Sequence, residues 1–457
     1  MTEAGCPLGG RPNGWKRELE IMKKTVAIHS MGCKANQYDS AVLEGMLAEA
    51  GWNLVDASEA ADAYIINTCT VTNEADKEAR YLIRRSHRKN PEASIVVTGC
   101  SAQTDPDALA QVEGVSYVVG NSKKANILDY LALSRPLTPQ IFVDDIFQEE
   151  ELFTSNFTSY SKNTRAFLKI QDGCNQMCSY CVIPFARGKN RSFSLEKVIE
   201  ELRRLSEQGF QEVVLTGIHI GTYGYDLNPA TSLLELLKQI EIQKPIHRVR
   251  VSSIDPEEVS DEMVEFLSSS RVICEHLHIP LQSGDDTILK LMRRRYTGEE
   301  FKDLTWKLKE KIPHICLGTD VMVGFPYEDE ERFESSFKTI RESALDYLHV
   351  FPYAAKKKTR AEKFLNQVGL REKRLRVEKL TEYSKELRHR FQQKSVGSQQ
   401  ELVIEDFHAN LGGMYRGISR NYLPVELLSD TNLKGKLVLS EITRYDQGHV
   451  FGKIIER

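Results

Sequence analysis

Three cysteines lie close together in the sequence and have the spacing of a metal-cluster motif. Cys174, Cys178 and Cys181 form the pattern CxxxCxxC, directly after a short apolar run at 167–170. Three closely spaced thiolates can ligate three irons of a cubane iron–sulfur cluster. The fourth iron is then open to a substrate molecule. The motif therefore predicts a cluster that takes part in chemistry.

Two other interpretations of this motif remain open, a zinc site and a set of buried structural thiols. A structural zinc ion normally takes four protein ligands in a closed site. No fourth cysteine or histidine lies near the motif in the sequence. Metal analysis of the protein distinguishes zinc from iron.

A second set of cysteines is spread along the amino-terminal part of the chain. Cys33, Cys69 and Cys100 each follow an apolar run that predicts a buried strand, at 25–29, 63–67 and 94–98. Taken singly, a cysteine is more often a small buried hydrophobic residue. However, the carboxyl ends of parallel strands line one crevice. Because all three cysteines lie at equivalent points, they predict a shared metal or cluster site.

The elements that must position these cysteines are strands alternating with helices. Residues 25–143 show this alternation, which predicts a parallel α/β sheet. A longer series of the same kind, from 165 to about 350, is compatible with a full or partial parallel barrel. After a charged helix at 371–393, short β-type runs with Gly and Asn turns at 397–457 predict a small antiparallel barrel. The predicted fold class is α/β.

These patterns divide the chain into five segments. We expect a disordered tail at 1–22, an α/β domain at 23–143, a linker at 144–163, a barrel domain at 164–392 and a small β-barrel domain at 393–457. Met22 is a second candidate for the start of translation.

Composition sets limits on location and partners. The formal net charge is −4, so the whole molecule does not attract nucleic acid, and any RNA contact must come from local basic runs. Such runs occur at 77–89, 293–295 and 356–360, although most charge runs are solvated faces. No apolar stretch approaches the roughly 20 residues of a membrane span. We therefore expect a cytoplasmic protein without a membrane partner, where clustered cysteines more often bind metal than form disulfides.

The motif at 174–181 is the one that defines radical S-adenosylmethionine (SAM) enzymes, and the chain resembles the methylthiotransferases among them. The resemblance extends from residue 25 to the end. It rests on these segments: GCKAN at 32–36, NTC at 67–69, TGC at 98–100, CVIPFARG at 181–188, LTG at 215–217, RVSS at 250–253, PLQSG at 280–284 and DVMVGFP at 320–326. The region at 417–425 resembles a TRAM domain, an RNA-binding module.

The resemblance implies two 4Fe–4S clusters and SAM as cofactors. It implies that Cys174, Cys178 and Cys181 hold the cluster that binds SAM and generates a 5′-deoxyadenosyl radical. A second cluster on Cys33, Cys69 and Cys100 would hold the sulfur to be transferred. The SAM contacts implied in this way are Tyr180, Gly217, Gly221, Ser252 and Gln282.

Lys34, in the GCKxN segment, favours the branch of the family that modifies C2 of N6-threonylcarbamoyladenosine next to the tRNA anticodon. The alternatives are isopentenyladenosine in tRNA and an aspartate of a ribosomal protein. Expected partners are the tRNA anticodon loop, an electron donor such as flavodoxin or ferredoxin, and a sulfur donor. Tyrosines that could stack on a splayed base are Tyr223, Tyr225, Tyr296 and Tyr415.

Two features stand apart from this interpretation. Residues 354–359 read AAKKKT where the family usually has serine, arginine and glycine before the threonine, and the added charge could serve a polyanionic substrate. Two functions from other classes are a non-catalytic RNA-binding protein with a structural cluster and a zinc-dependent RNA-binding module. A SAM cleavage assay and metal analysis separate these from an enzyme.

Overall fold

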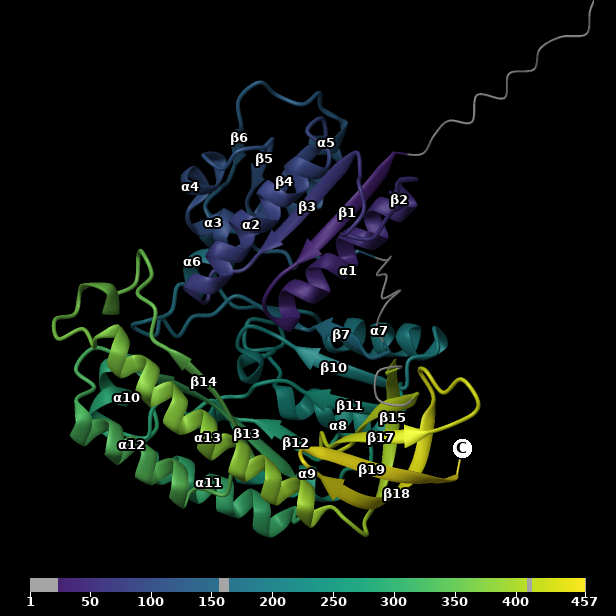
Figure 1. The fold of residues 1–457 in the computed structure, drawn as a ribbon, viewed down its shortest axis with the longest axis vertical. Helices are drawn as coiled ribbons and strands as arrows, with labels where there is room; N and C mark the ends of the chain where they lie inside the picture. Colours follow the sequence, from purple (N-terminus) through teal and green to yellow (C-terminus); the bar gives the residue numbers. More distant parts are fainter. Residues whose placement is uncertain (1–23, 156–163, 409–412, 457) are drawn as a thin grey trace, which may run out of the picture.

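The computed structural model describes residues 24–155, 164–408 and 413–456. The predicted tail at 1–22 lies outside the described residues. Three parts are visible in Figure 1: an amino-terminal sheet with its helices, a larger arrangement of strands and helices, and a small barrel beside it. The predicted α/β class is confirmed. In the described residues, no helix combines the length and the apolar character that crossing a membrane requires.

The amino-terminal sheet has six strands in the order β2-β1-β3-β4-β5-β6, and every pairing is parallel. The strands are β1 (Thr25–Ser30), β2 (Asn53–Leu54), β3 (Ala63–Thr68), β4 (Ser94–Gly99), β5 (Tyr117–Val119) and β6 (Gln140–Phe142). The helices are α1 (Lys34–Glu49), α2 (Asn73–Lys89), α3 (Cys100–Thr104), α4 (Pro106–Ala110) and α5 (Ile127–Ala132).

The sequence pattern predicts a helix at 41–50 capped by Asp39 or Ser40, whereas helix α1 begins seven residues earlier, at Lys34. Asp39, one of the two residues expected to cap it, lies inside the helix and is buried. Its carboxylate binds Lys124 at 2.7 Å and Lys169 at 2.6 Å, so it does not cap a backbone N–H. The difference arises because long-range ion pairs compete with local capping.

The central part is an open barrel built from two parallel three-stranded sheets. One contains β7 (Ala166–Lys169), β10 (Glu212–Thr216) and β11 (Arg248–Val251), and the other β12 (His276–His278), β13 (Cys316–Val323) and β14 (Tyr347–Pro352). Isolated parallel bridges, such as Val249–Ile273, join the sheets on one side. In the described residues β7 and β14 do not pair, so of the two predicted options the structure has the partial barrel.

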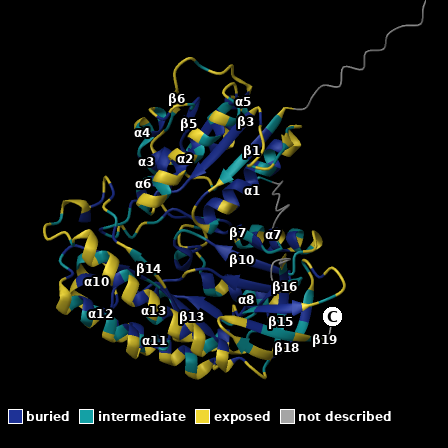
Figure 2. Ribbon diagram, viewed as in Figure 1, coloured by how far each residue is buried: buried dark blue, intermediate teal, exposed yellow. Residues whose placement is uncertain are grey.

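Amphipathic helices cover the outside of this barrel, with their buried faces toward the strands (Figure 2). They are α7 (Leu195–Glu207), α8 (Leu233–Gln243), α9 (Asp261–Ser269), α10 (Asp286–Met292), α11 (Gly298–Lys311) and α12 (Glu330–Glu342). Between β7 and α7, a short ribbon of β8 (Gln171–Asp172) and β9 (Arg191–Ser192) and the helix α6 (Ile183–Arg187) frame the CxxxCxxC segment.

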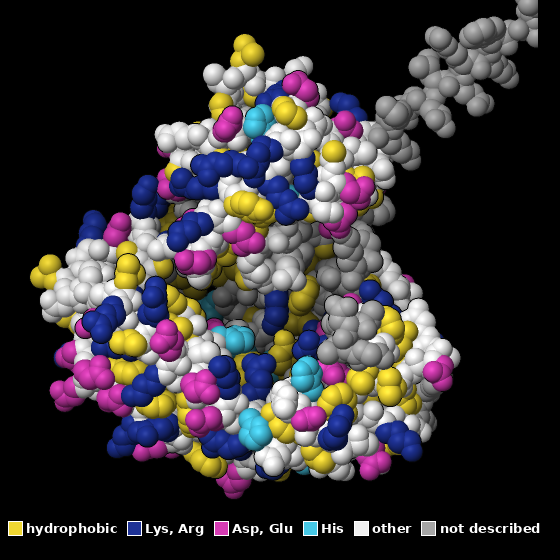
Figure 3. Space-filling view, viewed as in Figure 1, with side chains coloured by type: hydrophobic (Ala, Val, Ile, Leu, Met, Phe, Trp, Pro, Cys, Tyr) yellow, Lys and Arg dark blue, Asp and Glu magenta, His cyan; other side chains and the backbone are white. Residues whose placement is uncertain are grey.

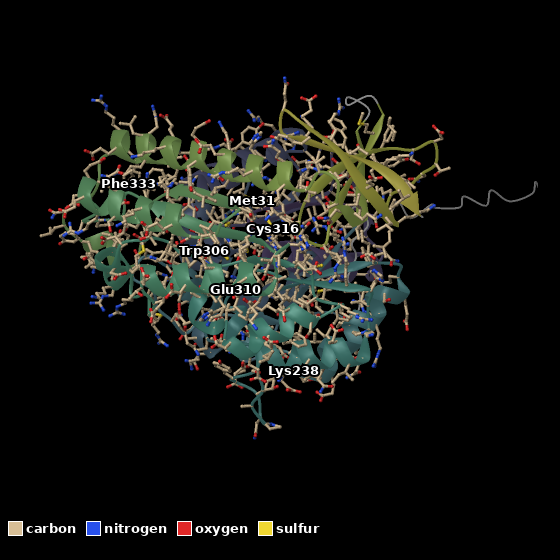
Figure 4. The ribbon with its side chains drawn as sticks, turned by 90° about the horizontal axis from the view of Figure 1, so that it is seen from below. Met31, Lys238, Trp306, Glu310, Cys316 and Phe333 are labelled. Carbon is tan, nitrogen blue, oxygen red and sulfur yellow. The ribbon has the colours of Figure 1, made fainter. Side chains whose placement is uncertain are left out.

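The predicted charged helix, α13 (Leu370–Lys394), packs on the edge strand β14. The Ser384 hydroxyl accepts a hydrogen bond from the Leu348 N–H at 2.8 Å and donates one to the Leu348 carbonyl at 3.0 Å. The cationic groups of Arg376 and Lys379 lie over the ring of Phe333 in α12. Phe333 is labelled in Figure 4. Helix α13 therefore covers an edge that would otherwise expose unpaired backbone groups.

The carboxy-terminal strands close into a barrel in the order β15-β16-β17-β19-β18. They are β15 (Gln399–His408), β16 (Met414–Ser419), β17 (Pro424–Leu428), β18 (Leu437–Asp446) and β19 (His449–Glu456). The pairings are antiparallel as predicted, except that β17 and β19 pair parallel. This barrel docks at the amino ends of the central strands, where Arg250 donates to the carbonyls of Ser419 and Arg420 at 2.9 and 2.8 Å.

Candidate active site

The three scattered cysteines all lie at the carboxyl edge of the amino-terminal sheet. Cys33 precedes α1, Cys69 follows β3, and Cys100 is the first residue of α3. Gly32 has a positive φ of 81°, and a Cβ on it would lie 2.6 Å from both Cβ and Sγ of Cys69. A larger residue at Gly32 therefore cannot fit, because the loop that carries Cys33 rests directly on the Cys69 side chain.

The electrostatics of these thiols also show that they converge. Burial raises the pKa of Cys33, and burial together with Cys100 and Cys33 raises the pKa of Cys69 to about 12. Yet Cys33 is accessible to solvent, whereas Cys69 and Cys100 are buried. A side chain that is both accessible and surrounded by protein lies in a hollow. Metal binding would have to deprotonate these thiols.

The CxxxCxxC segment forms a tight loop after β8. The Cys174 N–H donates to the carbonyl of Gly188 at 3.0 Å, and the Cys181 N–H donates to that of Cys178 at 3.1 Å. Gly173 has a positive φ of 77° and no room for a Cβ beside Lys189. Burial, followed by the neighbouring Cys178 and Cys174, raises the pKa of Cys181 to about 12. The loop therefore brings its three thiols together.

His219 and Arg294 contact this loop, and the sequence analysis did not predict either contact. His219 Nδ1 lies 3.7 Å from Cys174 Sγ. Arg294 Nη1 lies 3.7 Å from Cys178 Sγ, and the same guanidinium binds the Asp255 carboxylate at 2.8 and 3.0 Å. Arg294 belongs to the basic run at 293–295. Arg294, although it belongs to a basic run considered for RNA contact, is not a free surface charge, because Asp255 holds its guanidinium inside the protein.

A cavity of about 330 Å³ lies between the CxxxCxxC loop and the amino-terminal part. Tyr180, Cys181, Gln282 and Asp320 line it from the barrel, and Val71, two residues after Cys69, lines it from the amino-terminal sheet. The side-chain oxygen of Gln282 is buried and, among the described residues, has no hydrogen-bond partner. Two of the five predicted SAM contacts thus lie beside the loop of three cysteines, with one acceptor left for a ligand.

The other three predicted SAM contacts lie outside the lining of this cavity, Gly217 and Ser252 just after strands and Gly221 in the 3-10 turn Ile220–Thr222. Gly217, just after β10, packs against the side chain of Gln171, and Gly221 packs against that of Glu258. Ser252 is buried at the end of β11. Their part in SAM binding stays a prediction. For the two glycines, close packing is itself sufficient reason for the residue type.

The donor spacing distinguishes a cluster from a zinc ion. Among the described residues, His278, Asp320 and His349 form the one group of such side chains whose ligand atoms all lie within 4.8 Å of one another. The sulfurs of neither cysteine set are that close. Zinc binds thiolates at about 2.3 Å, which requires the sulfurs to approach to about 4 Å. Neither set of three thiols therefore has the sulfur spacing of a preformed zinc site.

Comparison with known proteins agrees with this geometry. Residues 168–340 match the model of the radical SAM superfamily, and residues 25–120 match Uncharacterized protein family UPF0004. The chain is 39% identical to the threonylcarbamoyladenosine tRNA methylthiotransferase MtaB of Bacillus subtilis, over 94% of this chain and 97% of that protein. The chain belongs to the radical SAM methylthiotransferase family.

Other relatives and one solved structure extend the comparison. Identity is 38% to MtaB of Aquifex aeolicus, over 88% of this chain and 96% of that one. It is 31% to the tRNA-2-methylthio-N(6)-dimethylallyladenosine synthase of Acetivibrio thermocellus, over 96% and 93%. The radical SAM methyltransferase TsrM of Kitasatospora setae has a similar fold, with a TM-score of 0.52 at 16% identity, over 72% and 73% of the chains.

Membership in the radical SAM methylthiotransferases implies a 4Fe–4S cluster and SAM. Basic side chains lie on the surface near the site. Figure 3 shows a hollow between the amino-terminal part and the barrel, in which Lys, Arg and His side chains gather. Basic side chains also gather over α2 in this view. In α2, Arg80, Arg84 and Arg88 are exposed at intervals of four residues, so they form one stripe.

The structure bears on two other candidate nucleic-acid contacts. Tyr223, Tyr296 and Tyr415 are buried, and of the four tyrosines considered for base stacking only Tyr225 is exposed. In the lysine-rich loop, Lys356 and Lys357 are paired with Asp76 and Asp105 of the amino-terminal part, at 2.6 and 3.1 Å. Their charge is therefore largely neutralised within the protein.

Proposed function

We propose that this protein attaches a methylthio group to C2 of N6-threonylcarbamoyladenosine next to the anticodon of tRNA. The observation that carries the proposal is the full-length similarity to proteins named for this modification, together with two convergent sets of three cysteines. When bound, a 4Fe–4S cluster and SAM supply one-electron chemistry that no side chain provides. The chain supplies ligands, orientation and a closed site.

In this proposal the residues divide into two groups. Cys174, Cys178 and Cys181 hold the cluster that binds SAM, and Tyr180 and Gln282 contact SAM in the cavity beside it. Cys33, Cys69 and Cys100 would hold a second 4Fe–4S cluster, which would supply the sulfur to be transferred. The cavity extends from Cys181 to Val71, two residues after Cys69, so a base placed in it would lie beside the CxxxCxxC loop and near the loop that carries Cys69.

Lys34 supports a substrate with a carboxylate. It follows Cys33 directly and occupies the first turn of α1, where the helix dipole disfavours a cation. Burial, and then the charges of Arg165 and Arg250, lower the pKa of Lys34 to about 8. Among the described residues no carboxylate lies within 4.0 Å of its ammonium group. The threonyl carboxylate would supply the missing counter-charge, whereas the isopentenyl group of the alternative tRNA substrate has none.

We further propose that the predicted domains at 23–143, 164–392 and 393–457 act together on tRNA in the cytoplasm. The carboxy-terminal barrel, proposed as a TRAM domain, and the stripe on α2 would bind phosphates, so affinity should fall with salt. An electron donor such as flavodoxin or ferredoxin and a sulfur donor complete the reaction.

Mass spectrometry of nucleosides from tRNA of a deletion strain and its complemented parent tests this function. We expect 2-methylthio-N6-threonylcarbamoyladenosine to disappear on deletion while its unmethylthiolated precursor accumulates. Loss of the methylthio derivative of isopentenyladenosine would identify the alternative tRNA substrate. An unchanged tRNA profile would redirect the search to the ribosomal protein.

A further inference from the structure

Arg187 occupies a buried position between the two cysteine sites. It is the last residue of α6, six residues after Cys181, and it is 1% exposed. Its Nη1 lies 2.9 Å from the carboxylate of Asp39 in α1 and 3.1 Å from that of Asp172, which precedes Gly173 and Cys174. Its Nη2 donates to the side-chain oxygen of Asn36. One guanidinium thus ties the helix that follows Cys33 to the loop that carries Cys174.

The ion pairs around Arg187 leave an excess of positive charge. Lys124 binds Asp39, and Lys169 binds both Asp39 and Asp172, at 2.6 to 2.8 Å. Three cations therefore share two carboxylates, and all five side chains are buried. Burying a charge without a partner is costly. A compensating negative charge is needed close to this network.

Two observations point from Arg187 toward the scattered cysteines. The Asn36 side chain, which accepts a hydrogen bond from Arg187, donates to the carbonyls of Met31 at 2.9 Å and Thr68 at 2.8 Å, next to the segments that carry Cys33 and Cys69. In addition, Arg187 Nε is buried and has no hydrogen-bond partner among the described residues. An orphaned charged donor of this kind requires an acceptor.

We propose that Arg187 is a positioning residue for the second cluster, whose negative charge it neutralises and toward which it directs its free N–H. The proposal rests on the second cluster of the proposed function. Three thiolates carry one more negative charge than the core of an oxidised 4Fe–4S cluster carries positive, so the cluster with its ligands would be an anion that the excess positive charge of the buried network stabilises. Nearby charge and hydrogen bonds to sulfur set the reduction potential of such clusters.

Substitutions of the two partners of the Arg187–Asp39 ion pair should shift the midpoint potential of the second cluster in opposite directions. Arg187→Gln removes a positive charge, so it should shift the midpoint potential of the second cluster to more negative values. Asp39→Asn removes a negative charge from the same network and should shift the potential to more positive values. Arg187→Lys keeps the charge but lacks Nε, so it should leave the potential near that of the parent and change the shape of the EPR signal.

The measurement is a potentiometric titration followed by EPR, in the full chain with Cys174, Cys178 and Cys181 replaced by alanine so that only the second site remains. Arg248→Met is the matched control. Arg248 is equally buried and binds Glu212 at 2.7 Å, but it lies at the opposite ends of the strands, against the carboxy-terminal barrel. It should leave the potential unchanged.

The outcomes separate this proposal from the proposed function. Unchanged potentials in Arg187→Gln and Asp39→Asn, or shifts of the same sign in both, would overturn the role of Arg187 alone. Failure of the parent chain to bind a cluster at Cys33, Cys69 and Cys100 would overturn both. If Arg187→Gln does not fold, the sign of the shift in Asp39→Asn and the EPR signal of Arg187→Lys decide the matter.

Discussion

The ammonium group of Lys356 lies 2.6 Å from the carboxylate of Asp76, so the loop after β14 is fastened to α2 of the amino-terminal part. Lys356 is buried, whereas the neighbouring Lys358 is exposed. The lysine-rich loop at 354–359 thus connects two parts of the molecule beside the cavity that Cys181 and Val71 line.

Lys356→Met should lower the free energy of unfolding by about 1 kcal/mol, the upper range for a partly exposed ion pair. It should not change the salt dependence of tRNA binding, because the lost charge is already paired. Chemical denaturation and binding at several salt concentrations measure the two effects. Lys358→Met is the control on the same loop. A salt slope reduced by about one unit in Lys356→Met would instead identify a phosphate contact.

The two cysteine sets should fail in different ways. Cys178→Ala removes a proposed cluster ligand from the CxxxCxxC loop and should abolish SAM cleavage. Cys69→Ala should still cleave SAM but form no methylthiolated product, because only the site proposed to hold the transferred sulfur is lost. Chromatography of 5′-deoxyadenosine and mass spectrometry of tRNA nucleosides measure the two reactions. Cys274→Ala, a buried cysteine in neither set, is the control. Normal product from Cys69→Ala would contradict the proposed role of the second site.

Lys34→Gln should lower kcat/KM for tRNA carrying the threonylcarbamoyl group roughly 10- to 100-fold. This is the range expected for one lost hydrogen bond to a charged group. SAM cleavage without tRNA should not change, because Lys34 belongs to the substrate side of the site. Lys189→Gln is a suitable control, since Lys189 is exposed near the other cysteine loop. Equal losses in both variants would argue against a specific contact with the carboxylate.

Stability should depend on pH through Glu328, which packs beside the loop after β13. Burial raises the pKa of Glu328 to about 7 from an ordinary value of 4.5, although Arg376 acts in the opposite direction. The native state binds the Glu328 proton more tightly than the unfolded state does, so protonation of Glu328 stabilises the fold. This stabilisation is complete below about pH 4.5 and is lost as pH rises through about 7. The change amounts to about 3 kcal/mol. Urea denaturation at pH 5 and pH 8 measures it, and Glu328→Gln should abolish this part of the dependence.

Much of the fold follows from local patterns in the sequence. Apolar runs of strand length alternate with amphipathic segments, and this is sufficient to predict the parallel sheet, the barrel strands and the charged helix α13. The edge strand β14 was not among the predicted strands, and the partial closure of the barrel stayed open as an alternative. Closure depends on which strands pair at the ends of the sheets, and no periodicity within one strand records that.

The sequence by itself determined the chemistry of the site. The spacing CxxxCxxC and the repetition of a cysteine after three strands both depend on short-range patterns, so Cys174, Cys178, Cys181, Cys33, Cys69 and Cys100 could be selected without a structure. Only the tertiary structure decided what surrounds them. Arg187, Arg294 and Lys356 are ordinary basic residues in sequence, and their partners Asp39, Asp255 and Asp76 are distant along the chain. Burial removes water from these charges, and only the fold selects which carboxylate replaces it.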